Sequence, residues 1–136
     1  MQITHFSDLL EAARRQDEPQ RLLMVFASAG LPSDASAAQR SAFANGEGGA
    51  LTPVLCVDKR PEEIGSFESL REESERTGIN WDIVFVAALA GRGGYPPNAD
   101  EAVQPLRMMV EQIKGGRIGQ FVAVSRGGDL LQLRAA

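Results

Sequence analysis

Three short apolar runs constrain the fold of this chain most strongly. They are RLLMVFASAG at residues 21–30, VLCVDK at residues 54–59 and WDIVFVAALA at residues 81–90. None is longer than ten residues, which is too short for a helix that crosses a bilayer. Glycine and proline lie near their ends, and short continuous apolar runs with such boundaries are typical of buried strands. We therefore expect three strands that are covered on both faces.

Helical patterns lie before, between and after these runs. They predict helices over residues 7–16, 35–44 and 67–77, with Ser7 and Ser66 as the N-caps of the first and third. A fourth helix is expected to begin near Gln104, because a proline inside a helix loses a hydrogen bond and clashes with the preceding turn. Pro105 would then lie in the first turn, where it is tolerated.

The alternation of strands and helices predicts an α/β fold. The expected architecture is a three-layer sandwich, with a mostly parallel sheet and helices on both faces. Two short apolar segments, 121–124 and 130–133, with two glycines between them predict a C-terminal antiparallel hairpin. A thioredoxin-like arrangement without the C-x-x-C motif is the alternative. The length and the lack of a visible linker predict one α/β domain over residues 1–136.

Composition and charge exclude several classes of partner. The formal net charge is −4 and the pI is about 5.0, so no general attraction to nucleic acid or to anionic lipid is expected. The N-terminus lacks a basic region followed by an apolar core, and the apolar runs are short. We therefore expect a cytoplasmic protein that binds neither nucleic acid nor membrane.

Residues able to carry catalysis are scarce. The chain has one cysteine, Cys56, and one histidine, His5, which lie far apart in sequence. There is no C-x-x-C motif, no G-x-S-x-G motif and no set of ligands with metal-binding spacing. Cys56 lies within an apolar strand pattern, where a free thiol is usually buried and inert. The sequence predicts no catalytic residue, no metal and no cofactor.

The stretch ALAGRGGYPPNADEA at residues 88–102 is the strongest candidate for a ligand site. In open α/β sheets, ligands bind beyond the carboxyl ends of the strands. Backbone amides of Gly91, Gly93 and Gly94 could converge on an anion there, and Arg92 could add a forked contact. The stretch matches neither G-x-G-x-x-G nor G-x-x-x-x-G-K-[ST], so a plain turn after the strand is the alternative.

Asp58 is the second candidate for ligand binding. It follows the second apolar run directly, at a position where acids often bind ligands in doubly wound folds. Lys59 and Arg60 come next in the chain. A surface ion pair is therefore the alternative role for this carboxylate.

Read as a whole, the chain resembles a family of short proteins from Burkholderia and related proteobacteria. The stretches that carry the resemblance are EPQRLLMVFASAGLP, GEGGALTPVLCVDK, IVFVAALAGRGG and GGRIGQF. Members of this family often carry the label "ribonucleotide reductase subunit alpha". The large subunit of such a reductase needs a radical-bearing cysteine and a redox-active cysteine pair inside a large barrel. A chain of 136 residues with one cysteine cannot run that reaction alone, so the resemblance implies no catalytic residue here.

Two classes of function follow from these observations. The first is a non-enzymatic protein that binds a partner protein or associates with itself, with the edge of the hairpin as the expected contact. The second is a binding protein or enzyme for a phosphorylated or otherwise anionic small molecule, which would use the loop after the third strand.

Overall fold

A computed structural model of the protein describes residues 3–30, 36–38 and 50–131. Within these residues the strands form one five-stranded sheet in the order β2-β1-β3-β4-β5. The elements in chain order are α1 (Phe6–Arg14), β1 (Gln20–Gly30), β2 (Ala50–Lys59), the 3₁₀ turn η1 (Pro61–Glu63), α3 (Phe67–Glu75), β3 (Ile83–Ala90), α4 (Ala99–Lys114), β4 (Val122–Ser125) and β5 (Leu130–Leu131). The helix predicted over residues 35–44 lies largely outside the described residues.

The sheet is antiparallel throughout, so the prediction of a mostly parallel sheet is wrong. The central strand, β1, pairs antiparallel with β2 on one side and with β3 on the other. The crossover through η1 and α3 joins two strands that run in the same direction, but β1 lies between them. A thioredoxin-like sheet contains parallel pairs and is excluded for the same reason. Continuous apolar runs report that both faces of a strand are covered, and they do not report its direction.

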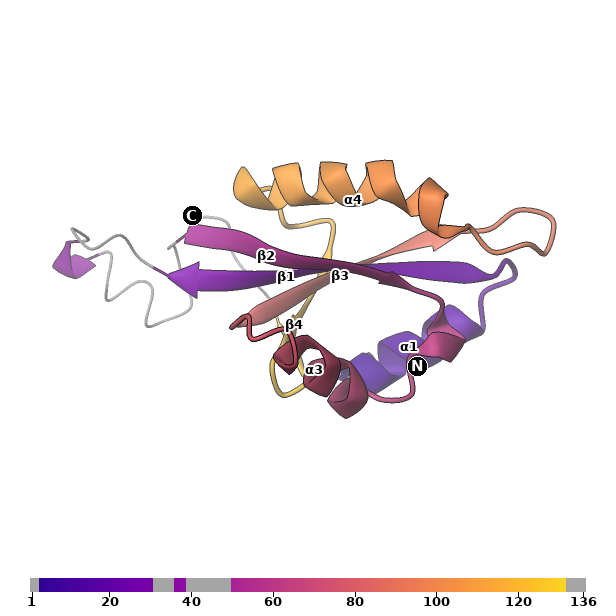
Figure 1. Ribbon diagram of the computed structural model, residues 1–136, viewed down its shortest axis with the longest axis horizontal. Coiled ribbons are helices and arrows are strands. Elements are labelled where there is room, and N and C mark those ends of the chain that lie inside the picture. The colour runs from indigo at the N-terminus through magenta and orange to yellow at the C-terminus, as the bar shows by residue number, and fades with distance from the viewer. Residues whose placement is uncertain (1–2, 31–35, 39–49, 132–136) are drawn as a thin grey trace.

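Helices cover both faces of the sheet (Figure 1). The helix α4 lies on one face, while α1 and α3 lie on the other. Side chains of β1 alternate between the two layers: Met24 and Phe26 pack with α1 and α3, whereas Leu23 and Val25 pack with α4. Both sets are buried, which explains why β1 is apolar along most of its length. No helix in the described ranges is long and apolar enough to cross a bilayer.

Side chains at the N-termini of two helices decide where these helices begin. Ser66 caps α3 and accepts a hydrogen bond from the amide of Ser69, as the sequence predicts. The cap of α1 is His5 rather than Ser7, so the prediction there is wrong. The imidazole Nδ1 of His5 accepts the amide hydrogen of Ser7 at 3.1 Å. This side chain therefore replaces the serine hydroxyl that the residue pattern favours at an N-cap.

The helix α4 begins at Ala99, earlier than predicted, and contains Pro105 in its interior. Asn98 and Glu101 form a reciprocal capping box at its start, with bonds of 2.9 and 3.2 Å. The carbonyl left without an amide partner by Pro105 belongs to the exposed Glu101, where water can reach it. Strong capping and hydration of this carbonyl therefore offset the cost of a proline inside the helix.

The capping carboxylate of α1 makes stability depend on pH. Asp8 accepts hydrogen bonds from the amides of Thr4 and His5, each at 3.2 Å, and these bonds lower its pKa. A lowered pKa stabilises the fold above the ordinary aspartate range, and this contribution is lost as pH falls through the folded-state pKa. We expect Asp8→Asn to lower the free energy of unfolding at neutral pH, with the difference from native shrinking as pH falls below the ordinary aspartate range.

Urea denaturation of both chains at several pH values tests this expectation. Asp17→Asn is the matched control, because Asp17 is an exposed acid outside the helix. A difference between Asp8→Asn and native that stays constant with pH would contradict the assignment of this carboxylate to the cap.

Candidate functional site: an open strand edge and its groove

The two edges of the sheet differ in whether they are covered. At the hairpin edge, the N-terminal segment pairs with the end of the sheet: the Leu130 amide donates to the Thr4 carbonyl at 3.0 Å, and the Phe6 amide to the Gly128 carbonyl at 2.8 Å. An isolated antiparallel β-bridge between His5 and Asp129 lies between these two hydrogen bonds. The hairpin edge that the sequence favoured for contacts is thus covered by the chain's own N-terminus. The opposite edge is formed by β2.

The outer side of β2 carries backbone groups that point away from β1. The Gly91 amide donates to the Pro19 carbonyl at 2.8 Å, so odd-numbered residues at the start of β1 direct their backbone groups toward β3. Residues alternate along an antiparallel strand, so the even-numbered residues of β1 bond to β2. The even-numbered residues of β1 lie opposite Leu55, Val57 and Lys59 of β2. The amides and carbonyls of Cys56 and Asp58 therefore point away from β1. In the described ranges of the chain, no residue pairs with these groups.

An irregularity limits the length of this open edge. Phe26 pairs with Leu55, but the next residue of β1, Ala27, pairs with Pro53, so Val54 is an extra residue in β2. Such a bulge interrupts a ladder, and proline has no amide hydrogen to donate. The regular open edge is therefore confined to the residues that follow the bulge.

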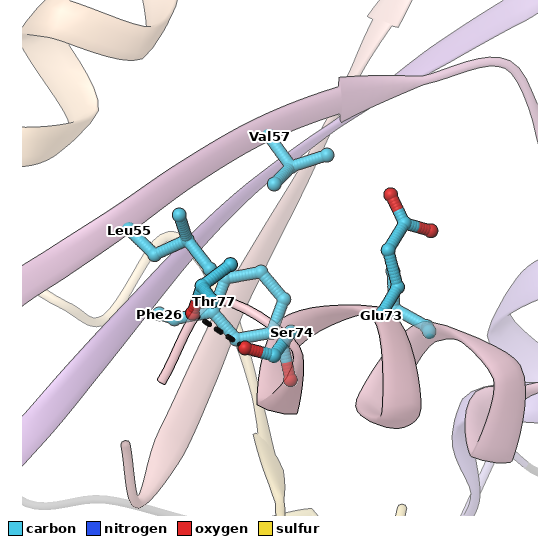
Figure 2. Close-up of a pocket in the computed structure, with 7 residues that line it drawn as sticks. Phe26, Leu55, Val57, Glu73, Ser74 and Thr77 are labelled. Atoms are coloured by element: carbon cyan, nitrogen blue, oxygen red, sulfur yellow. Dashed lines mark hydrogen bonds between the residues drawn. The ribbon is translucent and has the colours of Figure 1, made fainter. Parts of the chain in front are cut away.

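A small apolar groove lies beside this edge, between β2 and α3 (Figure 2). Its volume is about 60 Å³. Figure 2 shows Leu55 and Val57 of β2 on one wall, with Ser74 of α3 and Thr77 of the following turn on the other. The lining residues are Phe26, Leu55, Val57, Leu70, Glu73, Ser74 and Thr77. We call this space the β2–α3 groove.

The polar groups of the β2–α3 groove already have partners. The Ser74 hydroxyl donates to the Arg71 carbonyl at 2.6 Å and accepts the indole N–H of Trp81 at 2.8 Å. The Thr77 hydroxyl donates to the Ser74 carbonyl at 2.6 Å, as the dashed line in Figure 2 marks. The Glu73 carboxylate lies 3.1 Å from the ammonium group of Lys59 on β2. The groove therefore offers hydrocarbon surface to anything that enters it.

Cys56 and His5 lie on opposite faces of the sheet. Cys56 is opposite Val25, whose side chain packs with α4, whereas the His5 ring packs edge-on against Phe67 of α3. Cys56 is exposed, so the prediction that its side chain is buried is wrong. Neighbouring protein atoms still remove part of the water around the thiol, and this desolvation raises its pKa and keeps it protonated at neutral pH. Within the described residues, the imidazole of His5 is therefore kept away from this thiol.

The loop after β3 is a tight two-residue turn. The Arg92 amide donates to the Tyr95 carbonyl and the Tyr95 amide donates back, both at 3.0 Å. Gly93 and Gly94 lie between them with φ of 57° and 85°. Two central residues with positive φ are the geometry of a type I′ hairpin turn, which glycine adopts most easily. The glycines of GRGG are therefore explained by the turn.

The chain itself occupies amides of this loop that could have faced an anion. The Gly91 amide bonds to the Pro19 carbonyl, and the Gly94 amide donates to the carboxylate of Glu18 at 2.9 Å. An anion bound at Gly94 would have to displace this carboxylate. Arg92 is exposed beside the turn. Anion binding at these residues stays a prediction.

Asp58 lies at the same end of the sheet as this loop, and it forms an ion pair. Its carboxylate is 2.6 Å from the guanidinium of Arg21 on β1. Arg21 also donates to the Pro97 carbonyl at 3.4 Å, just before α4. The side chains are 13% and 24% exposed, so water screens the pair only partly. The geometry therefore supports the ion-pair alternative for Asp58, with an arginine from another strand as the partner.

A double-mutant cycle measures what this pair contributes. Arg21→Met and Asp58→Asn should each lower the free energy of unfolding by about 1–2 kcal/mol, because each leaves a half-buried partner without its counter-charge. The double variant should lose less than the sum of the two. Arg15→Met is the control, since the Arg15–Glu11 pair is well exposed and such pairs contribute little. Additive losses in urea denaturation would contradict the coupling.

A shallow hollow of about 290 Å³ lies beside Arg21, at the N-terminus of α4. Its second cation, Arg60, is paired with Glu62 and Glu63 at 3.6 and 3.3 Å. Both arginines of the hollow are thus neutralised by carboxylates of the same chain. Among the described residues, no group of three or more histidine, cysteine or acidic side chains could hold a metal ion.

No protein-family model, curated protein or solved structure matches this chain. The β2 edge and the β2–α3 groove are therefore assessed by their geometry. The sequence contained one signal for the edge: Pro53 lies in an otherwise strand-like run, and proline within a sheet is typical of edge strands or bulges. No pattern predicted the groove, because it depends on how α3 is placed beside β2.

Proposed function

We propose that this protein is a non-enzymatic binding protein that takes up an extended segment of a partner protein along the β2 edge. The observation that carries the proposal is the outward-facing amides and carbonyls of Cys56 and Asp58, which lie beside an apolar groove. An added strand would satisfy these backbone groups, and its alternate side chains would give specificity.

The irregularity of β2 limits how a second copy of the chain could pair with this edge. With the bulge at Val54 and the missing amide of Pro53, one symmetric register, centred on Val57, lets Cys56 and Asp58 of each copy bond to each other. A second copy would therefore have to fit this single short ladder. A short segment from another protein needs to match only the regular stretch around Cys56.

Selection of displayed random peptides on the full native chain tests the proposal. Peptides that bind should lose at least about tenfold in affinity for Cys56→Pro, because proline removes an outward donor that the fold does not use. Cys56→Ala is the matched control and should bind like the native chain. Fluorescence anisotropy with the selected synthetic peptides gives the affinities.

Three results would overturn the proposal: a library without binders, equal binding to Cys56→Pro and native, or equal losses in Cys56→Pro and Cys56→Ala. Amide spectra of both variants should overlay on the native spectrum away from β2, which shows that the fold is intact.

Light scattering should report a mass independent of concentration. A dimer that Cys56→Pro dissociates would assign the edge to a second copy instead.

The alternative of an anionic ligand at Gly91, Arg92, Gly93 and Gly94 has a separate test. We expect inorganic phosphate to leave the amide resonances of this loop unshifted, because the Glu18 carboxylate already accepts from Gly94. Saturable shifts, stronger in Glu18→Gln than in native protein, would instead support the anion site.

A further inference from the structure

The β2–α3 groove has the position and chemistry of a specificity pocket for the segment bound at β2. We infer that it receives one branched aliphatic side chain, of the size of valine, isoleucine or leucine, from an extended segment of a partner protein. This inference rests on the proposed function, and it adds the chemical class of the residue recognised.

Strand geometry decides which residue of the bound segment reaches the groove. Val57 directs its backbone groups toward β1 and its side chain toward the layer of α3. Residues directly opposite each other in a sheet project to the same face, with Cβ atoms about 4.5–5.5 Å apart. The residue opposite Val57 therefore extends toward the groove, whereas its two neighbours in the segment face the layer of α4.

The charges of the groove favour an uncharged occupant. Lys59 and Glu73 neutralise each other, and the hydroxyls of Ser74 and Thr77 are used within α3 and its surroundings. An ionised side chain in this space would lose water without gaining a partner, which is strongly unfavourable. An aliphatic side chain has no polar group to desolvate, and it would cover the half-buried Leu55 and Val57.

The size of the groove favours an aliphatic side chain over an aromatic ring. Its volume is about 60 Å³, whereas an engineered apolar cavity in another protein needed about 150 Å³ to hold benzene. The branches of a valine or leucine are much smaller than a ring. The groove is not fully enclosed, so the backbone of the bound segment can stay outside it.

The sequence profile of the peptides selected on the native chain tests this inference. We expect valine, isoleucine and leucine to be enriched at one fixed position, flanked by positions of free composition. In a synthetic binder, alanine at that position should weaken binding about tenfold and aspartate about a hundredfold or more. The flanking positions should tolerate both substitutions within about threefold.

A variant that fills the groove gives an independent measurement. Val57→Phe should weaken binding of the selected peptides about tenfold and remove the aliphatic preference, while Val57→Ile, the matched control, should keep both. If Cys56→Pro abolishes binding but no fixed aliphatic position exists, the inference is overturned and the proposed function stands. If no peptide binds the native chain, both are overturned. The peptide scan on native protein decides the matter even where Val57→Phe fails to fold.

Discussion

Replacement of Trp81 by alanine should lower the free energy of unfolding by about 3–5 kcal/mol, the largest effect that we expect for one substitution. The side chain is 2% exposed and its ring packs edge-on against Phe26 of β1, with centroids 4.9 Å apart. Its indole N–H bonds to the buried hydroxyl of Ser74. The guanidinium of Arg126 lies 4.7 Å from the ring centroid on the outer side. Alanine would leave a large cavity and remove all these contacts.

Trp81→Phe is the matched control for this measurement. Phenylalanine keeps most of the apolar volume and loses mainly the hydrogen bond to Ser74, so we expect a loss of about 1–2 kcal/mol. Urea denaturation followed by circular dichroism gives both values. Equal losses for the alanine and phenylalanine variants would show that the ring does not fill the core as described.

Gly91→Ala should lower the free energy of unfolding by about 3 kcal/mol, at the upper end for added atoms in packed sites. A Cβ atom at this position would clash with the carbonyl oxygen of Tyr95 and would lie 2.9 Å from that of Pro19. Both obstacles are backbone atoms, so a change of side-chain rotamer cannot relieve the contact. The turn must move away from the start of β1, and the bond from the Gly91 amide to Pro19 is lost.

Gly93 provides the control, because it lies in the same turn with open space around it. Gly93→Ala meets only the strain of a positive φ, which amounts to about 1–2 kcal/mol, and Gly93→Asn should be milder. Thermal or urea denaturation of the three variants ranks these losses. A milder effect at Gly91 than at Gly93 would contradict the close approach of the two backbones.

Sequence patterns predicted the elements of this fold better than their arrangement. The apolar runs correspond to β1, β2 and β3, and Ser66 caps α3 as expected, because burial and capping are encoded locally. Strand direction is not encoded in this way. It depends on β1 lying between β2 and β3, which a list of apolar runs does not contain.

The sequence likewise identified candidate site residues without their tertiary contacts. The GRGG stretch was predicted as an anion-binding loop because glycine is favoured both in a type I′ turn and in loops whose backbone amides bind anions. The partner of Asp58 is Arg21, 37 residues away in the chain, and no spacing rule connects them. The use of residues near Thr4 to cover the hairpin edge is likewise a tertiary contact. The sequence singled out the glycines and Asp58 but could not supply their neighbours.

The covering of one sheet edge by the N-terminal segment has a consequence for stoichiometry. In the described part of the chain, new strands can join the sheet at β2 but not beyond β5, because Thr4 already bonds to Leu130 there. A molecule with one open edge can take part in one strand addition at a time and cannot link two other molecules. Under the proposed function we therefore expect one-to-one complexes instead of filaments. The segment around Thr4 would then block strand addition at the hairpin edge. Its removal would expose a second edge at which a strand could be added.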